Sequence, residues 1–421
     1  MTTVDETHDP QLRSWVESAN EPDSDFPIQN LPFGVYRSRA AGSEWRGGVA
    51  IGDQVFDLAA VDAETGPTLN RLAAAGRSTW RDLRQRLSHT LSDRGQSAKL
   101  ERYLTSLSDV ELGLPVAVGD YTDFYSSYFH AYHAGQLFRP DDPLTPNFKW
   151  IPIGYHGRSS SIVPSGTSVH RPSGQQAPED DGPPAFGPSK ALDYEVELGL
   201  VVGPGNARGN PIPIDRAEDH LFGVVLLNDW SARDVQAWEY QPLGPFLSKS
   251  FATTLSPWVV TLEALAPFRA PAFARPQGDP EPLPYLADAQ NERQGHFDIQ
   301  VEAWIRTAGA ASPHRLSHTS YATNYWTAAQ LLTHHTSNGC PLEPGDLLGT
   351  GTVSGPNPDE AGTLLELSKA GASPVMQPDG AKRGFLEDGD ELVLRACCSA
   401  DGYRGIGFGE AKGTVTATVA P

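Results

Sequence analysis

Apolar and polar positions along the chain predict a buried strand followed by a polar helix. Residues 221–227 read L-F-G-V-V-L-L, an unbroken apolar run that is typical of a strand covered on both faces. The chain then turns polar at Asn228 and Asp229. Ser231 and Asp234 have the spacing of a capping box, which predicts that a helix begins there.

Three polar residues on that helix form a candidate binding face. Arg233, Gln236 and Tyr240 follow an i, i+3, i+7 spacing and therefore share one side of the helix. A carboxylate at a strand end, followed by a guanidinium, an amide and a phenol, suits a polar substrate. A solvated surface helix is the alternative interpretation, because polar stripes are the norm on surface helices.

A second segment, L-D-Y-E-V-E-L, alternates strictly between apolar and acidic residues. As a strand it places Asp193, Glu195 and Glu197 on one face. Like charges side by side repel, and a hard divalent cation that prefers carboxylate oxygens would remove this penalty. Asp229 and Asp123, in other polar segments, are further candidate ligands. The alternative is an exposed strand face with solvated acids.

A third segment, residues 120–139, is dense in groups that can do acid–base chemistry. Its candidates are Asp123, Tyr125, His130, His133 and Arg139. A histidine is the best general base near neutral pH, and it needs a partner, usually a carboxylate, to fix its tautomer. Sequence spacing does not select that partner, and two histidines three residues apart are equally consistent with a structural pair.

The wider pattern divides the chain into two units with a junction near Leu114–Pro115. The first unit combines a β-rich part, residues 33–58, with a helical face marked by Trp80, Leu83, Leu87 and Leu91. Beyond the junction, short apolar runs separated by Gly, Pro, Asn and Asp predict many strands and turns. Residues 171–187 and 267–284 are expected to be irregular loops, and residues 324–337 a helix ended by Gly339.

Composition narrows the class of protein. The 421 residues carry 32 basic and 52 acidic side chains, a formal net charge of −20, which argues against nucleic acid or an anionic membrane as partner. The N-terminus lacks the features of a signal peptide, and no apolar run is long enough to span a bilayer. Three cysteines, two of them adjacent, fit neither a zinc site nor a disulfide framework and favour a reducing cytoplasm.

Several runs of residues, in one order along nearly the whole chain, are more specific than any single motif. They are F-P-I-Q-N-L-P-F-G-V, D-Y-T-D-F-Y-S-S, G-Y-H-G-R-S-S-S, L-D-Y-E-V-E-L, N-D-W-S-A-R-D-V-Q-A-W-E-Y, P-L-G-P-F-L-S-K-S-F, L-T-H-H-T-S-N-G-C and D-G-D-E. With these runs the chain closely resembles the fumarylacetoacetate hydrolase family, in its fumarylacetoacetase branch. The resemblance implies a mainly β fold with some helices, in a homodimer. A small SH3-like domain is expected at residues 1–115 and a large mixed β-sandwich roll at residues 116–421.

The resemblance also implies an activity and a cofactor. The expected reaction is hydrolysis of a carbon–carbon bond of 4-fumarylacetoacetate to fumarate and acetoacetate, the last step of tyrosine and phenylalanine breakdown. A divalent metal, Mg²⁺ and/or Ca²⁺, is expected on Asp123, Glu195, Glu197 and Asp229. Asp193 lies outside this ligand set, and Lys249 and Thr253 match positions near a second cation.

For catalysis, the resemblance assigns the general base to His130 and its orienting acid to Glu366. Arg233, Gln236 and Lys249 are expected to stabilise the oxyanion. The residues expected to bind the small diketo-acid substrate are Tyr125, Arg139, Tyr155, Arg233, Gln236, Tyr240 and Thr352. Arg139 would pair with a substrate carboxylate.

Two features depart from the family pattern. His133 is a histidine where the family leads us to expect none, and the residues before Phe26 match poorly, so that this tail is expected to be disordered. A hydrolase, hydratase or decarboxylase of the same superfamily that acts on another oxo-acid, such as an acylpyruvate, is the alternative function. A calcium-binding protein without activity would leave His130 and Arg233 with no reason to converge.

Overall fold

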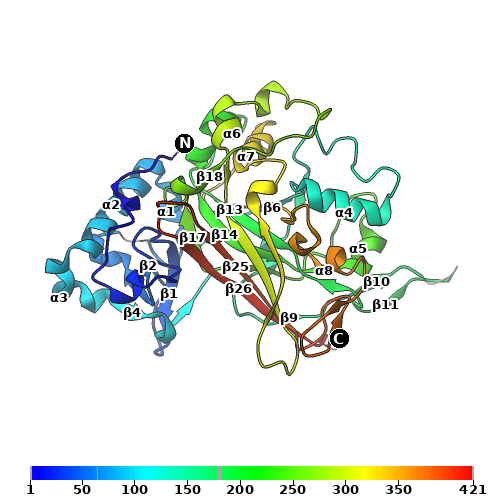
Figure 1. The fold of residues 1–421 in the computed structure, drawn as a ribbon, viewed down its shortest axis with the longest axis horizontal. Coiled ribbons are helices and arrows are strands. Elements are labelled where there is room, and N and C mark those ends of the chain that lie inside the picture. The colour runs from blue at the N-terminus through cyan, green and yellow to red at the C-terminus, as the bar shows by residue number, and fades with distance from the viewer. Residues whose placement is uncertain (1, 64, 179–181, 420–421) are drawn as a thin grey trace.

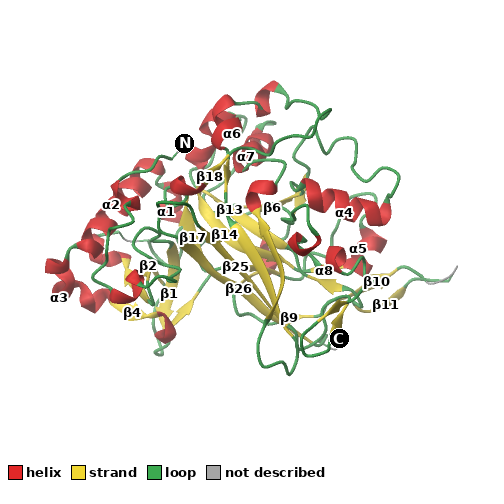
Figure 2. Ribbon diagram, viewed as in Figure 1, coloured by secondary structure: helices red, strands yellow, loops and turns green. Residues whose placement is uncertain are grey.

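The protein is built around central β-sheets with helices on the outside (Figure 1). The structure is a computed structural model that describes residues 2–63, 65–178 and 182–419. The sheets occupy the middle of the molecule, and most helices lie along its periphery (Figure 2). The N-terminal helices cover one side, while the segments that carry the candidate site residues lie on the other side.

The strands belong to one large sheet, one five-stranded sheet and several pairs. The large sheet contains β1 (Phe33–Ser38), β2 (Arg46–Ile51), β3 (Gln54–Asp57), β4 (Leu104–Ser106), β5 (Val110–Leu112), β6 (Tyr121–Phe124), β7 (Gly154–His156), β8 (Ile162–Pro164), β13 (Val196–Val202), β14 (Leu221–Asp229), β16 (Thr253–Leu255), β17 (Trp258–Thr261) and β22 (Leu347–Gly349). The five-stranded sheet contains β9 (Val169–His170), β20 (Gln300–Arg306), β21 (His314–Ser320), β25 (Glu391–Cys398) and β26 (Ile406–Thr416).

Short strand pairs and helices complete the described part of the chain. The pairs are β10 (Ser173–Gln176) with β11 (Ala185–Pro188), β12 (Leu192–Asp193) with β15 (Ser231–Ala232), β18 (Arg269–Ala270) with β19 (His296–Phe297), and β23 (Val375–Met376) with β24 (Lys382–Arg383). The helices are α1 (Asn70–Ala74), α2 (Arg77–Ser92), α3 (Ser97–Leu100), α4 (Tyr128–Phe138), α5 (Arg233–Glu239), α6 (Ala289–Gln294), α7 (Ala328–Thr336) and α8 (Leu364–Leu367).

The main path of the large sheet runs β4-β3-β2-β1-β17-β14-β13-β22-β6-β7, which puts β14 between β17 and β13. Every residue of β14 is buried. Val224 and Leu226 belong to the core that includes the five-stranded sheet, whereas Val225 and Leu227 belong to the core that includes α2. The predicted strand over residues 221–227, covered on both faces, is therefore confirmed.

The N-terminal segments follow the sequence pattern closely. β1, β2 and β3 confirm the predicted β-rich part, and the predicted helical face on α2, from Trp80 to Leu91, is buried in the second core. β1 also pairs with β17, so the N-terminal strands extend the large sheet instead of forming a separate one. The division at residue 115 and the SH3-like description stay predictions.

The expectation of a disordered N-terminal tail is wrong. Residues 6–8 and 17–20 form short 3₁₀ helices. Ser14 Oγ and Trp15 Nε1 donate hydrogen bonds to the carbonyl oxygens of Leu91 and Thr90 on α2, and a buried arginine of α2 binds both the tail and the residues after it. Arg84 donates hydrogen bonds to Thr7 Oγ1 at 3.0 Å and to the carbonyl oxygens of Asn30 and Gln29 at 2.7 and 2.5 Å. Burial lowers the pKa of Arg84 to about 10, so its guanidinium stays charged at neutral pH.

The helix after β14 exists but begins differently from the prediction. α5 starts at Arg233, and no side chain caps its N-terminus. Ser231 instead lies in β15, where it pairs with Asp193, and Asp234 accepts hydrogen bonds from Ser189 Oγ and the Lys190 amide. The capping-box interpretation fails because the Ser231 hydroxyl donates to the Asp229 carbonyl oxygen and Asp234 is bonded to distant residues.

Two further predictions needed adjustment. The helix expected from residue 324 begins only at Ala328, because Thr327 and Gln330 form a capping box there. Residues 171–187 contain the β10–β11 hairpin instead of an irregular loop, with residues 179–181 outside the described part of the chain. Residues 267–284 are irregular as expected, apart from β18 and a 3₁₀ turn at each end.

All three cysteines, Cys340, Cys397 and Cys398, are free. Across the described ranges, no helix combines the length and the apolar character that crossing a membrane requires.

Replacing Arg84 with leucine is expected to release the N-terminal tail. The substitution leaves three buried acceptors without their donor, and the free energy of unfolding should fall by about 2–4 kcal/mol. Urea unfolding measures the loss, and limited proteolysis should show new cleavage within residues 2–30. Arg81→Leu is the control: its side chain is half exposed, 3.8 Å from Asp5, and should cost less than about 0.5 kcal/mol. Equal effects of the two substitutions would contradict this account.

Candidate active site

Four carboxylates from three segments meet where the central strands of the large sheet end. They are Asp123, Glu195, Glu197 and Asp229, and each offers an oxygen within 4.8 Å of the others. Strand register brings them together: Val196 of β13 pairs with Asn228 of β14, and Gly349 of β22 pairs with Asp123 of β6. The structure therefore brings together the four acids that were predicted as metal ligands.

The acidic strand that contributes two of these groups is buried on both faces. Asp193 and Glu197 are fully buried, and the alternating Tyr194 and Val196 pack into the core that includes the five-stranded sheet. The strand is interrupted between β12 and β13, so Asp193 bonds to Arg233 and lies outside the four-acid cluster. The alternative of an exposed strand with solvated acids is wrong.

Two buried cations neutralise part of this charge. Lys249 Nζ lies 2.6 Å from Glu195 Oε2 and 2.8 Å from Asp229 Oδ2, and Arg233 Nη1 lies 2.7 Å from Glu195 Oε1. Burial alone would raise the pKa of Glu195, but Lys249 and Arg233 hold that pKa well below its usual range. Burial likewise works against the charge on Lys249, yet Asp229 and Glu195 raise its pKa, so the ammonium stays charged. Thr253 Oγ1 donates to Asp229 Oδ1 at 2.8 Å.

Around the remaining acids the protein supplies too little positive charge to keep every carboxyl group ionised. Burial, followed by the charge of Asp229, raises the pKa of Asp123 to about 8, and burial with Asp123 raises the pKa of Glu197 well above its usual value. Asp123 Oδ1 and Glu197 Oε1 are buried and have no hydrogen-bond partner within the described structure. Unpaired carboxylate oxygens that face each other are the ligands a hard divalent cation prefers. The donor set therefore fits such a cation.

A histidine–carboxylate pair lies beside the cluster. His130 Nδ1 is 2.7 Å from Glu366 Oε2, and both side chains are nearly buried. Burial would raise the pKa of Glu366, but the charge and hydrogen bond of His130, with a further bond from His133, hold it well below its usual range. Because an ionised carboxylate only accepts, His130 must carry its proton on Nδ1, which leaves Nε2 free to accept another. When protonated, His130 would lower the pKa of Glu195, so the imidazole lies within electrostatic range of the cluster.

The unexpected histidine shares the same acid. His133 Nδ1 lies 3.1 Å from Glu366 Oε1, while its side chain is 28% exposed, against 6% for His130. Glu366 thus binds one imidazole with each oxygen. Which imidazole acts as the base stays a prediction, and the burial of His130 supports its assignment.

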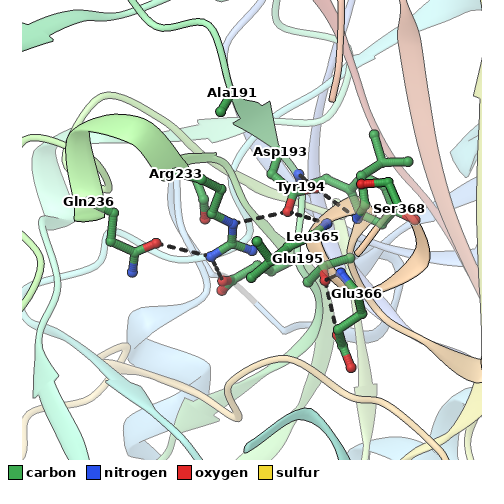
Figure 3. Close-up of polar contacts among 12 residues, drawn as sticks. Ala191, Asp193, Tyr194, Glu195, Arg233, Gln236, Leu365, Glu366 and Ser368 are labelled. Carbon is green, nitrogen blue, oxygen red and sulfur yellow. Dashed lines mark hydrogen bonds and ion pairs between the residues drawn. The ribbon is translucent and has the colours of Figure 1, made fainter. Parts of the chain in front are cut away.

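The predicted polar stripe on α5 divides between the interior and the surface. Figure 3 shows Arg233 between Asp193, Glu195 and Gln236. Arg233 Nη1 donates to Gln236 Oε1 at 3.1 Å, and among the described residues Arg233 Nη2 is buried without a partner. Tyr240 follows the end of α5 and is exposed.

The other predicted substrate-binding residues surround the same region. Tyr155 donates to Asp229 Oδ2 at 3.4 Å, and Thr352 Oγ1 is buried without a partner in the described part of the chain. Arg139 ends α4, is exposed, and borders a pocket of about 440 Å³. Burial and the charge of Glu366 raise the pKa of Tyr125, and the charges of Arg139 and Arg233 both act to lower it.

Sequence reasoning missed two residues that hold Glu366. Thr363 Oγ1 and Ser354 Oγ donate to Glu366 Oε2 at 2.9 and 3.0 Å. Thr363 precedes Glu366 by three residues, the spacing of a capping box, so a local signal existed. Ser354 is twelve residues away, and nothing local marks it.

Comparison with known proteins identifies the family. The C-terminal profile of fumarylacetoacetate (FAA) hydrolase matches residues 124–419, and the fumarylacetoacetase N-terminal profile matches residues 29–115. The chain belongs to the fumarylacetoacetate hydrolase family.

Relatives within the family match along almost their whole length. A fumarylacetoacetase from Oryza sativa is 48% identical over 426 residues, which covers 96% of this chain and 97% of the relative. The fumarylacetoacetase from Homo sapiens is 46% identical over 418 residues, covering 95% and 98% of the two chains. The fumarylacetoacetase from Caenorhabditis elegans is 48% identical, covering 93% and 96%.

Solved structures support the fold alone. A fumarylacetoacetate hydrolase from psychrophilic Exiguobacterium antarcticum superposes with a TM-score of 0.52 at 19% identity, covering 91% of this chain and 99% of its own. This likeness agrees with the mostly β architecture and large mixed sheets described above, as expected from the sequence.

Replacing Glu197 with glutamine is expected to weaken binding of Mg²⁺ or Ca²⁺ at least about tenfold. The amide removes one ligand charge from a site that depends on charge, while the shape of the side chain is kept. Isothermal titration calorimetry on chelator-treated protein measures the affinity. Glu111→Gln, an exposed glutamate paired with Arg37, should leave the affinity unchanged. An unchanged affinity in the Glu197 variant would exclude Glu197 as a ligand.

Proposed function

We propose that this protein hydrolyses a carbon–carbon bond of 4-fumarylacetoacetate to give fumarate and acetoacetate. The relatives that match over nearly their whole length carry the name of this activity. The single observation that supports it most directly is the His130–Glu366 pair beside the four-acid cluster. Such a pair supplies a general base, and the cluster supplies the charge that a divalent cation needs.

The proposed cofactor is a divalent cation, Mg²⁺ and/or Ca²⁺, held by Asp123, Glu195, Glu197 and Asp229. When bound, it would act as a Lewis acid and a template for the two oxygens of a 1,3-diketone. Lys249 is charged and contributes to this region as a counter-ion. A second cation near Lys249 and Thr253 stays a prediction.

The proposed proton path begins at His130. With Nδ1–H held by Glu366, the free Nε2 accepts a proton from a water molecule, whose oxygen forms a bond to the substrate carbonyl carbon. Cleavage of the carbon–carbon bond leaves an electron pair on the departing carbon, which the proton on His130 neutralises. Glu366 keeps the imidazole oriented and stabilises its transient positive charge.

Three donors are available for the oxyanion that forms during attack. Arg233 Nη2 has no partner within the described structure, and Lys249 makes two bonds of the three that an ammonium can donate. Gln236 accepts from Arg233 through Oε1, which leaves its NH₂ group free to donate. Preorganised donors of this kind usually supply the largest catalytic contribution.

The ends of the substrate would be bound by the remaining predicted residues. Arg139, whose charge acts on the pKa of Tyr125, suits a substrate carboxylate. The proposed contacts along the diketone are Tyr125, Tyr155, Tyr240 and Thr352.

A homodimer is proposed as the working form. Large apolar side chains are exposed along the end of α5, the following loop and the β10–β11 hairpin: Phe186, Trp238, Leu243, Phe246 and Leu247. Exposed apolar groups in this number are typical of an interface. Sedimentation velocity of the protein should give twice the chain mass, and a Leu243→Asp, Phe246→Asp variant should sediment as a monomer.

The predicted cytoplasmic location stays a prediction.

Purified protein supplied with fumarylacetoacetate is expected to release fumarate and acetoacetate, and removal of divalent cations with a chelator should abolish the reaction. Chromatographic identification of both products checks the chemistry. An acylpyruvate, assayed in parallel, should turn over much more slowly. Turnover of the acylpyruvate alone would assign the protein to the other activity.

The His130→Ala variant is expected to lose at least about 10²-fold in kcat, because the general base is removed. Its affinity for the cation and its unfolding midpoint should stay close to those of the parent protein. His133→Ala is the matched control, since it removes the second partner of the same carboxylate. If His130→Ala keeps its activity and His133→Ala loses it, the base is His133.

A further inference from the structure

Asp193 is a buried acid beside the cluster for which the sequence offered no function. Its side chain is fully buried, and four donors converge on its two oxygens (Figure 3). Oδ1 accepts from the amides of Tyr194 and Leu364, both at 2.9 Å, and Oδ2 accepts from the Leu365 amide at 3.0 Å and from Arg233 Nε at 2.9 Å. A carboxylate saturated in this way makes strong charge-assisted hydrogen bonds.

Two of these donors begin the helix that carries the orienting acid. Leu364 and Leu365 are the first two residues of α8, and Glu366 is the third. α8 is a single turn of four residues, too short to hold its own position through helical hydrogen bonds. Its location depends on the burial of Leu364 in the core and on what binds its first amides, and Asp193 binds two of them.

The same carboxylate also fixes the cation side of the site. Arg233 donates one hydrogen bond from Nε to Asp193 and another from Nη1 to Glu195. Its planar guanidinium is therefore held between Glu195, which belongs to the four-acid cluster, and Asp193, which does not. A continuous series of hydrogen bonds therefore links the four-acid cluster to the His130–Glu366 pair. It runs from Glu195 through Arg233 and Asp193 to α8.

We propose that Asp193 is a positioning residue that sets the distance between the His130–Glu366 pair and the four-acid cluster. The proposal rests on the proposed hydrolysis. Asp193 does not touch the substrate; it holds Glu366 through the amides of α8 and holds Arg233 through its guanidinium. In this arrangement the water molecule activated by His130 lies close to the substrate carbonyl held at the four-acid cluster.

A neutralising role alone does not explain this geometry. Arg233 already has Glu195 as a counter-ion, and the two α8 amides carry no net charge that requires an acid. An amide side chain at this position would present an NH₂ group to at least one of the donors, so that Arg233 and α8 would no longer be held together. The substitution is therefore expected to misalign Glu366 and Arg233 relative to each other. A displacement of about 1 Å in such groups can lower the rate about 10²-fold.

The first test is Asp193→Asn, measured with and without Glu366→Gln. The single variant should lose about 10²-fold in kcat and clearly less in affinity for Mg²⁺, because Asp193 acts on the ligand Glu195 only through Arg233. Adding Glu366→Gln should cost less than the two separate losses multiplied together. A fully multiplicative loss would mean that Asp193 does not act through Glu366, and would overturn the proposal.

The second test removes a single donor. Leu364 is the first residue of α8, where proline is tolerated, and Thr363 before it has the extended conformation that proline requires. Leu364→Pro removes the amide hydrogen bond to Asp193 Oδ1. Leu364→Ala is its control, since it also loses the buried side chain but keeps the amide. The proline variant should have a lower kcat than the alanine variant at the same cation affinity; equal values would contradict the proposal.

Hydrogen exchange separates this proposal from the activity on which it rests. In the parent protein the amides of Leu364 and Leu365 should exchange slowly, and in Asp193→Asn at least about tenfold faster. If the parent forms no fumarate but the exchange difference is seen, the proposed function fails and the link through Asp193 stands. If the parent is active and the exchange is unchanged, the link fails and the function stands.

Discussion

The site depends on a concentration of negative charge that the fold buries where its central strands end. Five carboxylates, including Asp193, face only two buried cations, Arg233 and Lys249. Isolated charges are costly in the interior, and like charges in contact add to that cost. The raised pKa values of Asp123 and Glu197 are the direct expression of the remaining imbalance. A bound divalent cation would supply the missing positive charge, so that binding the cation would also stabilise this part of the fold.

The scaffold tolerates this imbalance because its strands are anchored on both sides. β14 is buried along its whole length between two cores, and β13 pairs with it through seven residues before their polar ends meet the site. Apolar burial of this extent offsets the local electrostatic cost. The polar residues are therefore confined to the strand ends, where the backbone is already fixed and the acids cannot move apart.

The base side is built differently, from short elements held by side chains. His130 lies on α4, and Glu366 lies on the single turn α8, more than two hundred residues later. Hydrogen bonds from Ser354, Thr363 and the two histidines hold Glu366, while Asp193 holds the turn itself. Rigid strands thus fix the four-acid cluster, and a hydrogen-bond network fixes the His130–Glu366 pair. Arg233 joins the two parts of the site.

The sequence by itself determined the elements whose signal is local. It predicted the buried strand at β14, the apolar face of α2 and, through the family resemblance, the four acids that converge. Apolar periodicity encodes burial directly, so these predictions hold. Only the tertiary structure decided that Asp193 faces Arg233 and α8, that His133 shares Glu366, and that Arg84 binds Thr7 of the N-terminal tail. Each of these contacts joins residues on different elements, and the partner of a polar side chain is chosen by packing in space, which spacing along the chain does not record.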